Sequence, residues 1–275
     1  MPGDSEDPNA AAQYHLGVGR EDVASSVLLP GNPDRLETIT DCWEEADERG
    51  AHREFRTATG TYRGTPISVT STGIGSPSAA IALEELARIG ANTFVRVGSC
   101  GTLRRDVDVG DLVITTGAVR QEGTSDEYVR PDYPAVAHHE VVTALIAAAE
   151  RLGHPYHVGL TMSADSFYAG QGRPGFRGFE AEGSETLLDA LREANVTNVE
   201  MEASAILTLA SIYGLRAGAV CAVYANRETG EFRTEGDDRA AETASLAIAL
   251  LAQMDEQTAK AGVDHWHAGI GLGDD

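Results

Sequence analysis

Hydrophobic positions along the chain form short, β-branched runs that alternate with helical patterns. Six such runs predict strands, at residues 23–29, 66–70, 93–97, 112–116, 157–162 and 217–223. Over residues 142–152 the apolar positions recur three or four apart, which predicts an amphipathic helix. Similar patterns at 79–89, 203–213 and 240–255 predict three more helices. Strands that alternate with helices indicate an α/β fold with a twisted, mixed central β-sheet flanked by helices.

Three segments depart from this alternation. Residues 53–63 are strand-like and contain the turn signal Thr59-Gly60, which predicts an added hairpin. Residues 170–184, rich in glycine and charge, and residues 226–238 are expected to be excursions from the domain. No linker or internal repeat divides the chain. We therefore expect one domain over residues 1–275, with loose tails at 1–12 and 260–275.

Composition excludes several classes of protein. Hydrophobic residues make up 42% of the chain, which excludes wholesale disorder. No apolar run reaches the roughly 18–20 residues of a membrane span, and the N-terminus lacks a signal-peptide pattern. The three cysteines are widely spaced and form no CxxC pair, which argues against a disulfide framework and a zinc site. We expect a cytoplasmic protein with no membrane partner.

The charge balance is strongly acidic. Asp and Glu number 43 against 21 Lys and Arg, for a formal net charge of −22, and Lys260 is the only lysine. Such a field repels polyanions, so nucleic acid is not an expected partner. An acid excess with almost no lysine favours an environment of high salt, as in a halophile, over a mildly acidic mesophilic protein. A site for an anionic substrate would then have to be built locally from arginines.

Glycine-rich turns follow several predicted strands. In the first, at residues 28–35, Gly31 ends a strand, Asn32 can cap a helix, and Arg35 lies one turn into that helix. Backbone N–H groups at such a junction can bind an anion. The alternative is a plain turn with a surface arginine. A second turn, at residues 71–78, also has glycines, a capping serine and a proline before a helix.

A third turn, at residues 95–101, contains a charged residue inside an apolar strand. An unpaired Arg96 guanidinium would be costly there, so Arg96 either pairs with a buried carboxylate or points to a ligand at the strand end. Ser99 offers a hydroxyl in the bend that follows. None of these turns matches the dinucleotide or triphosphate loop patterns, so those ligands are not expected.

Two acids precede the predicted helix at 203–213. Glu200 and Glu202 flank Met201, and their carboxylates can accept hydrogen bonds from sugar hydroxyls. They can equally be helix N-terminal acids stabilised by the helix dipole. His15 forms no metal-ligand spacing with the other histidines, and no GxSxG elbow supports a serine hydrolase.

Taken together and in order, these elements resemble one known family. Nine short stretches carry the resemblance, at residues 15–17, 30–35, 52–55, 71–78, 96–99, 163–168, 171–173, 198–202 and 225–227. They are similar to the uridine phosphorylase branch of the trimeric and hexameric nucleoside phosphorylases. The similarity extends from about His15 to about Gln253, nearly the whole chain.

The resemblance implies a role for each matching residue. Phosphate would be bound by the Gly31 backbone, Arg35, Arg96 and Ser99, and by Arg53 of a neighbouring subunit. The ribose would contact Glu200, Met201 and Glu202, and His15 of the neighbour. The base would lie against Phe167, with Gln171 and Arg173 contacting the uracil edge and Arg227 on a segment that closes over the site. A monovalent cation such as K⁺ would bind Glu54, the Ile74 carbonyl and Ser78 between subunits.

The reaction implied is phosphorolysis of uridine to uracil and ribose 1-phosphate, in which Arg173, helped by Gln171, stabilises the departing base. Inorganic phosphate is the co-substrate and no other cofactor is expected. The implied assembly is a homohexamer, a trimer of dimers with active sites shared between subunits. Three alternatives stay open: a guanosine or inosine phosphorylase, a nucleosidase that uses water, and a catalytically silent nucleoside-binding module.

Some positions differ from the family pattern. Asn32 stands where Asp is common, and Ser99 where Thr is usual, but both keep a polar side chain. Tyr224-Ala225 replaces a more aliphatic pair beside the base pocket, which could reshape selectivity. Asn226 lies in the region where the purine branch would have an Asp, and together with Gln171 and Arg173 this favours a pyrimidine.

Overall fold

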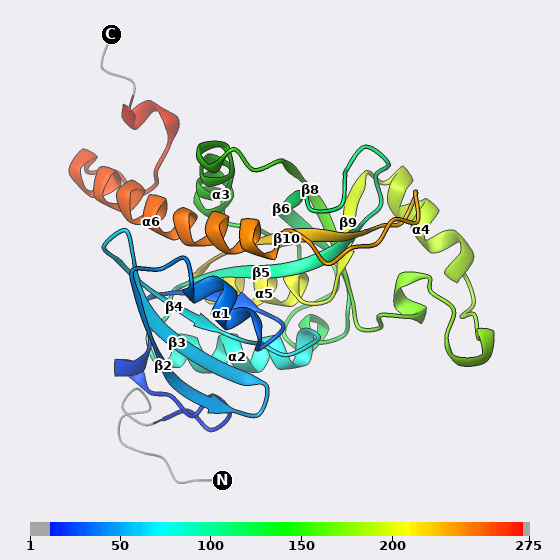
Figure 1. Ribbon diagram of the computed structural model, residues 1–275, viewed down its shortest axis with the longest axis horizontal. Helices are drawn as coiled ribbons and strands as arrows, with labels where there is room; N and C mark the ends of the chain where they lie inside the picture. Colours follow the sequence, from blue (N-terminus) through cyan, green and yellow to red (C-terminus); the bar gives the residue numbers. More distant parts are fainter. Residues whose placement is uncertain (1–11, 272–275) are drawn as a thin grey trace.

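A ten-stranded sheet organises the chain, and the computed structural model describes residues 12–271. Part of the sheet closes into a ring, β5-β10-β6-β8-β9, because β5 pairs with both β9 and β10. From β5 an open wing continues through β1, β4, β3 and β2 (Figure 1). The strands are β1 Ser26–Pro30, β2 Glu45–His52, β3 Phe55–Tyr62, β4 Thr65–Thr70, β5 Thr93–Thr102, β6 Leu112–Gln121, β7 Ala135–Val136, β8 Tyr156–Ala164, β9 Val196–Glu200 and β10 Arg216–Asn226.

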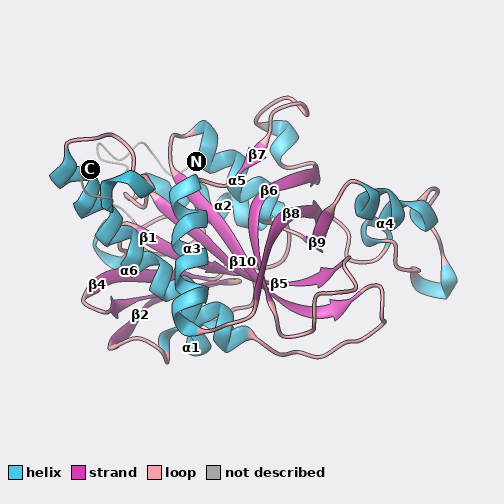
Figure 2. Ribbon diagram, turned by 90° about the horizontal axis from the view of Figure 1, so that it is seen from above, coloured by secondary structure: helices cyan, strands magenta, loops and turns pink. Residues whose placement is uncertain are grey.

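Helices cover both faces of this sheet. One layer contains α3 and α6, which pack against each other, and the other contains α2 and α5 (Figures 1 and 2). Each layer has its own cluster of buried apolar side chains against the sheet, which accounts for the amphipathic patterns in the sequence. The α-helices are α1 Arg35–Thr40, α2 Ser76–Arg88, α3 His139–Leu152, α4 Ser184–Glu193, α5 Ala203–Ile212 and α6 Asp237–Ala261.

The predicted fold class, a single α/β domain with a mixed sheet flanked by helices, is confirmed. All six predicted strands overlap strands of the sheet, and the four predicted helices correspond to α2, α3, α5 and α6. Elements β2, β9 and α4 were not predicted. Strand β2 is the outermost strand of the wing and almost entirely exposed, so it lacks the alternation of a half-buried strand.

The turn expected at Thr59-Gly60 is wrong. Strand β3 runs straight through these residues, and the wing turns instead at Arg53-Glu54 and Arg63-Gly64. Gly60 pairs with Ala46 of β2, and a Cβ atom there would come within 1.8 Å of the Glu45 carbonyl oxygen. The glycine therefore permits a close approach of two strands, not a reversal of the chain.

The two chain ends differ in how much is described. The tail expected at residues 1–12 lies outside the described residues, apart from Ala12. After Lys260, the Trp266 backbone N–H donates to Glu140 of α3, and its indole N–H donates to Gln257 of α6. Among the described residues, no helix combines the length and apolar character that crossing a membrane requires.

Candidate active site

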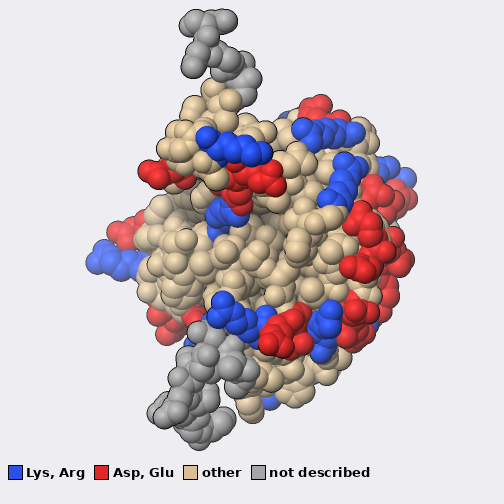
Figure 3. All heavy atoms as spheres, turned by 90° about the vertical axis from the view of Figure 1, so that its left-hand side faces the viewer, with Lys and Arg blue, Asp and Glu red and all other residues tan. Residues whose placement is uncertain are grey.

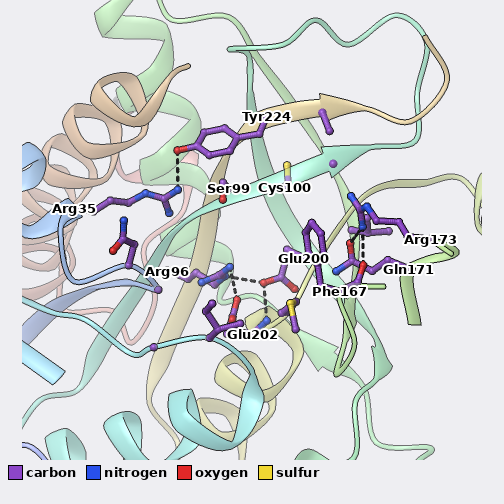
Figure 4. Close-up of a pocket in the computed structure, with 18 of the residues that line it drawn as sticks. Arg35, Arg96, Ser99, Cys100, Phe167, Gln171, Arg173, Glu200, Glu202 and Tyr224 are labelled. Atoms are coloured by element: carbon purple, nitrogen blue, oxygen red, sulfur yellow. Dashed lines mark hydrogen bonds and ion pairs between the residues drawn. The ribbon is translucent and has the colours of Figure 1, made fainter. Parts of the chain in front are cut away.

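A cavity of about 680 Å³ opens where four parallel strands end. Strands β1, β4, β5 and β10 run in the same direction, so their carboxyl ends and the turns that follow meet at one edge of the sheet. The lining comes from these turns, from the segment after β8 and from the β9–α5 junction (Figure 4): Gly31, Asn32, Pro33, Arg35, Glu54, Gly73, Ile74, Arg96, Ser99, Cys100, Gly101, Phe167, Gln171, Arg173, Val199, Glu200, Met201, Glu202, Tyr224, Ala225 and Phe232.

Arg96 is buried in the lining of this cavity, and the first alternative for its position in an apolar strand, pairing with a buried carboxylate, is what the structure shows. Its Nε donates to Glu200 Oε2 at 2.7 Å, and its Nη2 is ion-paired with Glu202 (Figure 4). Its third nitrogen, Nη1, is buried without a hydrogen-bond partner and lies beside Gly31. A buried, charged donor without a partner is costly, so an anion at the Gly31 turn would satisfy it.

Glu200 is among the lining residues, but its carboxylate is mainly occupied by Arg96 and neighbouring donors. Its carboxylate is fully enclosed and also accepts hydrogen bonds from the Ser163 hydroxyl and the backbone N–H groups of Glu202 and Ala203. Three of these four donors converge on Oε2, and Oε1 accepts only the Ser163 hydroxyl. Glu200 therefore holds Arg96 and the start of α5 in place, and the ribose contact expected for it stays a prediction.

Glu202 is the acid that remains available to a ligand. It accepts a hydrogen bond from the Gly75 N–H, and the neighbouring Met201 carbonyl accepts one from Ser76 at 3.0 Å, which ties the β4–α2 turn to this segment. Burial raises the pKa of Glu202, and the adjacent Glu200 carboxylate raises it further, while Arg96 opposes both. Met201 lies on the cavity wall beside it.

Arg35 is the second cation at this end of the cavity. Its Nη2 donates to the Tyr224 hydroxyl at 2.9 Å, and its Nε lies 3.3 Å from Asp237 Oδ2, outside hydrogen-bond geometry. Ser99 lines the cavity on the neighbouring strand β5. The side chains of Arg35 and Arg96 lie on the same side of the cavity (Figure 4), and Gly31 lies beside Arg96 Nη1.

Phe167, Gln171 and Arg173 form the opposite end (Figure 4). The Arg173 guanidinium lies over the Phe167 ring at 4.1 Å, and its Nη1 donates to the Gln171 side-chain oxygen and to the Phe167 carbonyl. Burial and the nearby Arg227 charge lower the pKa of Arg173 to about 10. At neutral pH this guanidinium is therefore still charged.

Arg227 lies next to the cavity and not in it. It lines an adjoining hollow together with Phe167, Arg173 and Phe232. Its Nη1 is buried without a hydrogen-bond partner, and burial together with Arg192 lowers its pKa. This arginine thus carries a second unsatisfied donor close to the Arg173 end.

Two expected site residues lie outside the cavity of their own chain. His15 Nδ1 lies 2.7 Å from Glu85 Oε1 of α2, and Glu85 also accepts the N–H groups of His15 and Leu16. Arg53 occupies the β2–β3 turn with a φ of 57° and contacts the Tyr14 ring. A left-handed backbone at a non-glycine residue is uncommon and points to a constrained turn.

The three expected cation ligands do lie together. Ser78 Oγ donates to Glu54 Oε1 at 2.9 Å, and both side chains surround Gly73, next to Ile74. Glu54 and Ile74 also line the cavity. Among the described residues, no group of three or more His, Cys, Asp and Glu side chains could hold a metal ion.

The sequence did not predict four lining or supporting residues. Cys100 and Phe232 line the cavity, and Asp237 and Glu85 support Arg35 and His15. From the sequence, Tyr224 is only a departure from the family pattern beside the base pocket, whereas in the structure its hydroxyl contacts Arg35. For Asp237, the sequence offers only an ionisable side chain downstream of the matched stretch at 225–227 as a sign that it could belong to the site.

Comparison with known proteins agrees with this geometry. The sequence profile of the Phosphorylase superfamily matches residues 26–254. The chain belongs to this superfamily. It is 57% identical over 258 residues to a uridine phosphorylase of Thermococcus kodakarensis, covering 94% of this chain and 93% of that protein. These matches confirm the family to which the nine stretches pointed.

Two further relatives differ in the base that their names give. The chain is 40% identical over 235 residues to a guanosine phosphorylase of Halorubrum lacusprofundi, covering 85% of this chain and 92% of that protein. It is 38% identical over 242 residues to the uridine phosphorylase of Escherichia coli, covering 87% of this chain and 96% of that protein. Which base this chain prefers therefore has to be argued from the residues that line the cavity.

Proposed function

We propose that this phosphorylase converts uridine and inorganic phosphate into uracil and ribose 1-phosphate. One observation carries the proposal: the unpartnered Nη1 of buried Arg96 faces a glycine turn at one end of a nucleoside-sized cavity. Gln171 and Arg173 lie at the other end. The most extensive similarity quoted above, to a uridine phosphorylase, supports the same reaction.

At the anion end, phosphate binds the Gly31 backbone, Arg35, Arg96 and Ser99. Guanidinium groups match phosphate oxygens in geometry and charge, and the backbone of the Gly31 turn before α1 adds N–H donors. The ribose rests on Met201 and donates hydrogen bonds from its 2′- and 3′-hydroxyls to Glu202. Glu202 keeps acceptor capacity for these hydroxyls, because Arg96 Nε and the backbone N–H groups of Glu202 and Ala203 donate to Glu200.

At the base end, uracil lies against Phe167. The planar Arg173 fork and the Gln171 amide present donors and an acceptor to the edge of the pyrimidine. As the glycosidic bond breaks, negative charge develops on uracil and positive charge on the sugar. Arg173 stabilises the first and bound phosphate the second while it attacks, so both groups act most strongly in the transition state. Arg227, with its unsatisfied Nη1, moves in to complete this end.

Asn226 argues for a pyrimidine over a purine. In the purine branch this region would carry an acid directed at the base. Here the Asn226 amide donates to the carbonyls of Arg104 and Val107 and accepts the N–H groups of Glu228 and Thr229. Two of these contacts tie Asn226 to the segment after β5 and two lie within its own loop, so the side chain is taken up by the protein and is not available to a base. A guanosine activity stays the second candidate because of the 40% identical relative.

The charge of the anion site supports an active site shared between subunits. Within one chain, the cations Arg35 and Arg96 contact three acids, Asp237, Glu200 and Glu202, so the site has no surplus positive charge. A third arginine is therefore needed to attract phosphate. We propose that Arg53 of a second copy supplies it and that His15 of the same copy contacts the 5′-hydroxyl, in a hexamer built as a trimer of dimers.

Two finer features belong to the same proposal. Oxygen donors from Glu54, the Ile74 carbonyl and Ser78 suit K⁺, and a second copy would have to complete the coordination. The net charge of −22 with a single lysine supports work at high salt, where repulsion between subunits is screened. The cytoplasmic location expected from the sequence stays a prediction.

Product analysis tests the reaction class. Incubation with uridine and phosphate should release uracil and ribose 1-phosphate in equal amounts, with no release when phosphate is left out. Equal uracil release without phosphate, together with free ribose, would indicate hydrolysis, and binding without turnover would indicate a silent module. Repeating the assay in dilute buffer and in molar salt should give the higher activity in salt; equal activity would contradict the high-salt proposal.

A further inference from the structure

Tyr224 connects Arg35 to helix α6. Its hydroxyl oxygen accepts a hydrogen bond from Arg35 Nη2 at 2.9 Å, and its O–H donates to Asp237 Oδ2 (Figure 4 shows the contact with Arg35). The same Oδ2 atom lies 3.3 Å from Arg35 Nε. Arg35 of α1, Tyr224 of β10 and Asp237 of α6 thus form a closed triangle at the anion end of the cavity. Arg35 and Tyr224 are 189 residues apart in sequence, and Tyr224 and Asp237 are 13 apart.

This triangle fixes where the Arg35 guanidinium points. The Arg35 side chain is only 11% exposed, and its Nε makes no hydrogen bond, so water contributes little to its orientation. The Tyr224 ring lies 5.5 Å from the guanidinium carbon and supports it from one side. Burial and the bond to Asp237 raise the pKa of Tyr224, so the hydroxyl keeps the proton that it donates to Asp237.

We propose that Tyr224, oriented by Asp237, is a positioning residue for the anionic co-substrate. It holds the Arg35 guanidinium toward the Gly31 turn, so that two guanidinium groups are directed at one anion before the anion arrives. This inference rests on the proposed function, because it requires Arg35 to bind phosphate. It predicts that loss of the Tyr224 hydroxyl weakens phosphate binding and leaves nucleoside binding unchanged.

A positioning role of Tyr224 and a merely structural one predict changes in different quantities when the hydroxyl is lost. If Tyr224 only stabilised the fold, its loss would lower the melting temperature and leave the phosphate KM where it is. If it positions Arg35, its loss lets the guanidinium sample other orientations, and the phosphate KM rises at nearly constant kcat. Pre-organisation of a binding group acts in this way because it removes an ordering cost from the binding step.

The test compares Tyr224→Phe with the wild type. The substitution keeps the ring against Arg35 and removes only the hydroxyl. We expect the phosphate KM to rise about 10- to 150-fold, the range for losing one hydrogen bond to a charged group, with the uridine KM and kcat within about twofold. Tyr156→Phe is the matched control, because that hydroxyl also donates to a carboxylate, Glu150 at 2.6 Å, outside the cavity. An unchanged phosphate KM in folded Tyr224→Phe overturns the inference.

A double-mutant cycle sharpens the result. In an Arg35→Ala background, Tyr224→Phe should cause no further change in kcat/KM for phosphate, because the group that it positions is gone. Additive losses in the two variants would also overturn the inference. Phosphate binding by calorimetry, without nucleoside, separates this claim from the proposed function. Wild-type protein that binds phosphate without cleaving uridine would refute the reaction alone, whereas failure to bind phosphate would refute both.

Discussion

Arg173 is held in a way that suits a group acting on charge that develops during the reaction. It stacks over Phe167, is fixed by Gln171, and lies close enough to Arg227 for the two charges to repel each other. That repulsion and burial destabilise its charged form. A base that becomes negative as it departs relieves this cost, so the interaction is stronger in the transition state than in the ground state.

Replacing Arg173 by Ala should therefore lower kcat for uridine phosphorolysis by about 10²–10³-fold, the scale of one electrostatic stabiliser. Folding should be unaffected, because the residue lies on a glycine-rich segment at the surface end of the cavity. Arg177→Ala is the matched control: Arg177 is an exposed arginine of the same segment, stacked on Phe176. Near-normal turnover in Arg173→Ala would remove this residue from the base site and favour a purine substrate.

At the scale of single residues, the sequence predicted the glycine turn and the cavity arginines but not how their charges are balanced. Arg96 could be expected to need a carboxylate, yet nothing in the sequence assigns it both Glu200 and Glu202, 104 and 106 positions away. The same holds for Asp237, which reaches Arg35 only because β10 and α6 bring it there. Contacts of this kind depend on the register of the strands, which a single sequence does not encode locally.

At the scale of elements, the β2–β3 hairpin is the part of the fold on which the proposed shared site depends, because it carries Arg53. It forms the open end of the sheet, and its turn places Glu54 in the cavity lining but not Arg53. The sequence predicted a hairpin here but gave the wrong turn, because Gly60 was interpreted as a reversal signal and β2 shows no apolar periodicity. Helix α4 was not predicted; it begins at Ser184, where the predicted excursion at 170–184 ends.

Subunit mixing tests the role of that turn. Arg53→Ala and Arg96→Ala should each be almost inactive alone, because each removes a phosphate contact from every site. In a mixed dimer, one site then collects both losses and the other has neither, so co-refolding should restore a substantial fraction of activity. Each variant refolded with itself is the control. If mixing restores nothing, Arg53 serves its own chain and the shared-site proposal fails.

At the scale of the whole molecule, net charge bears on whether several copies of the chain can associate as proposed. Charged side chains lie mainly toward the rim of the face in Figure 3, around an uncharged centre. With −22 charges on each chain, unscreened repulsion opposes association of several copies. The sequence composition alone predicts this repulsion, since net charge does not depend on the fold. The position of the uncharged area, in contrast, is seen only in the structure.

The central claim is that this cavity phosphorolyses uridine, and a side-by-side substrate panel tests it most directly. Uridine, thymidine, inosine and guanosine would each be assayed with saturating phosphate in molar salt, with kcat/KM as the readout. Uridine should have the highest kcat/KM, with the purine nucleosides at least about 100-fold lower, because the internally bonded Asn226 offers a purine no contact that could compensate for misfit at Arg173. Guanosine or inosine turnover equal to or above that of uridine would contradict the account.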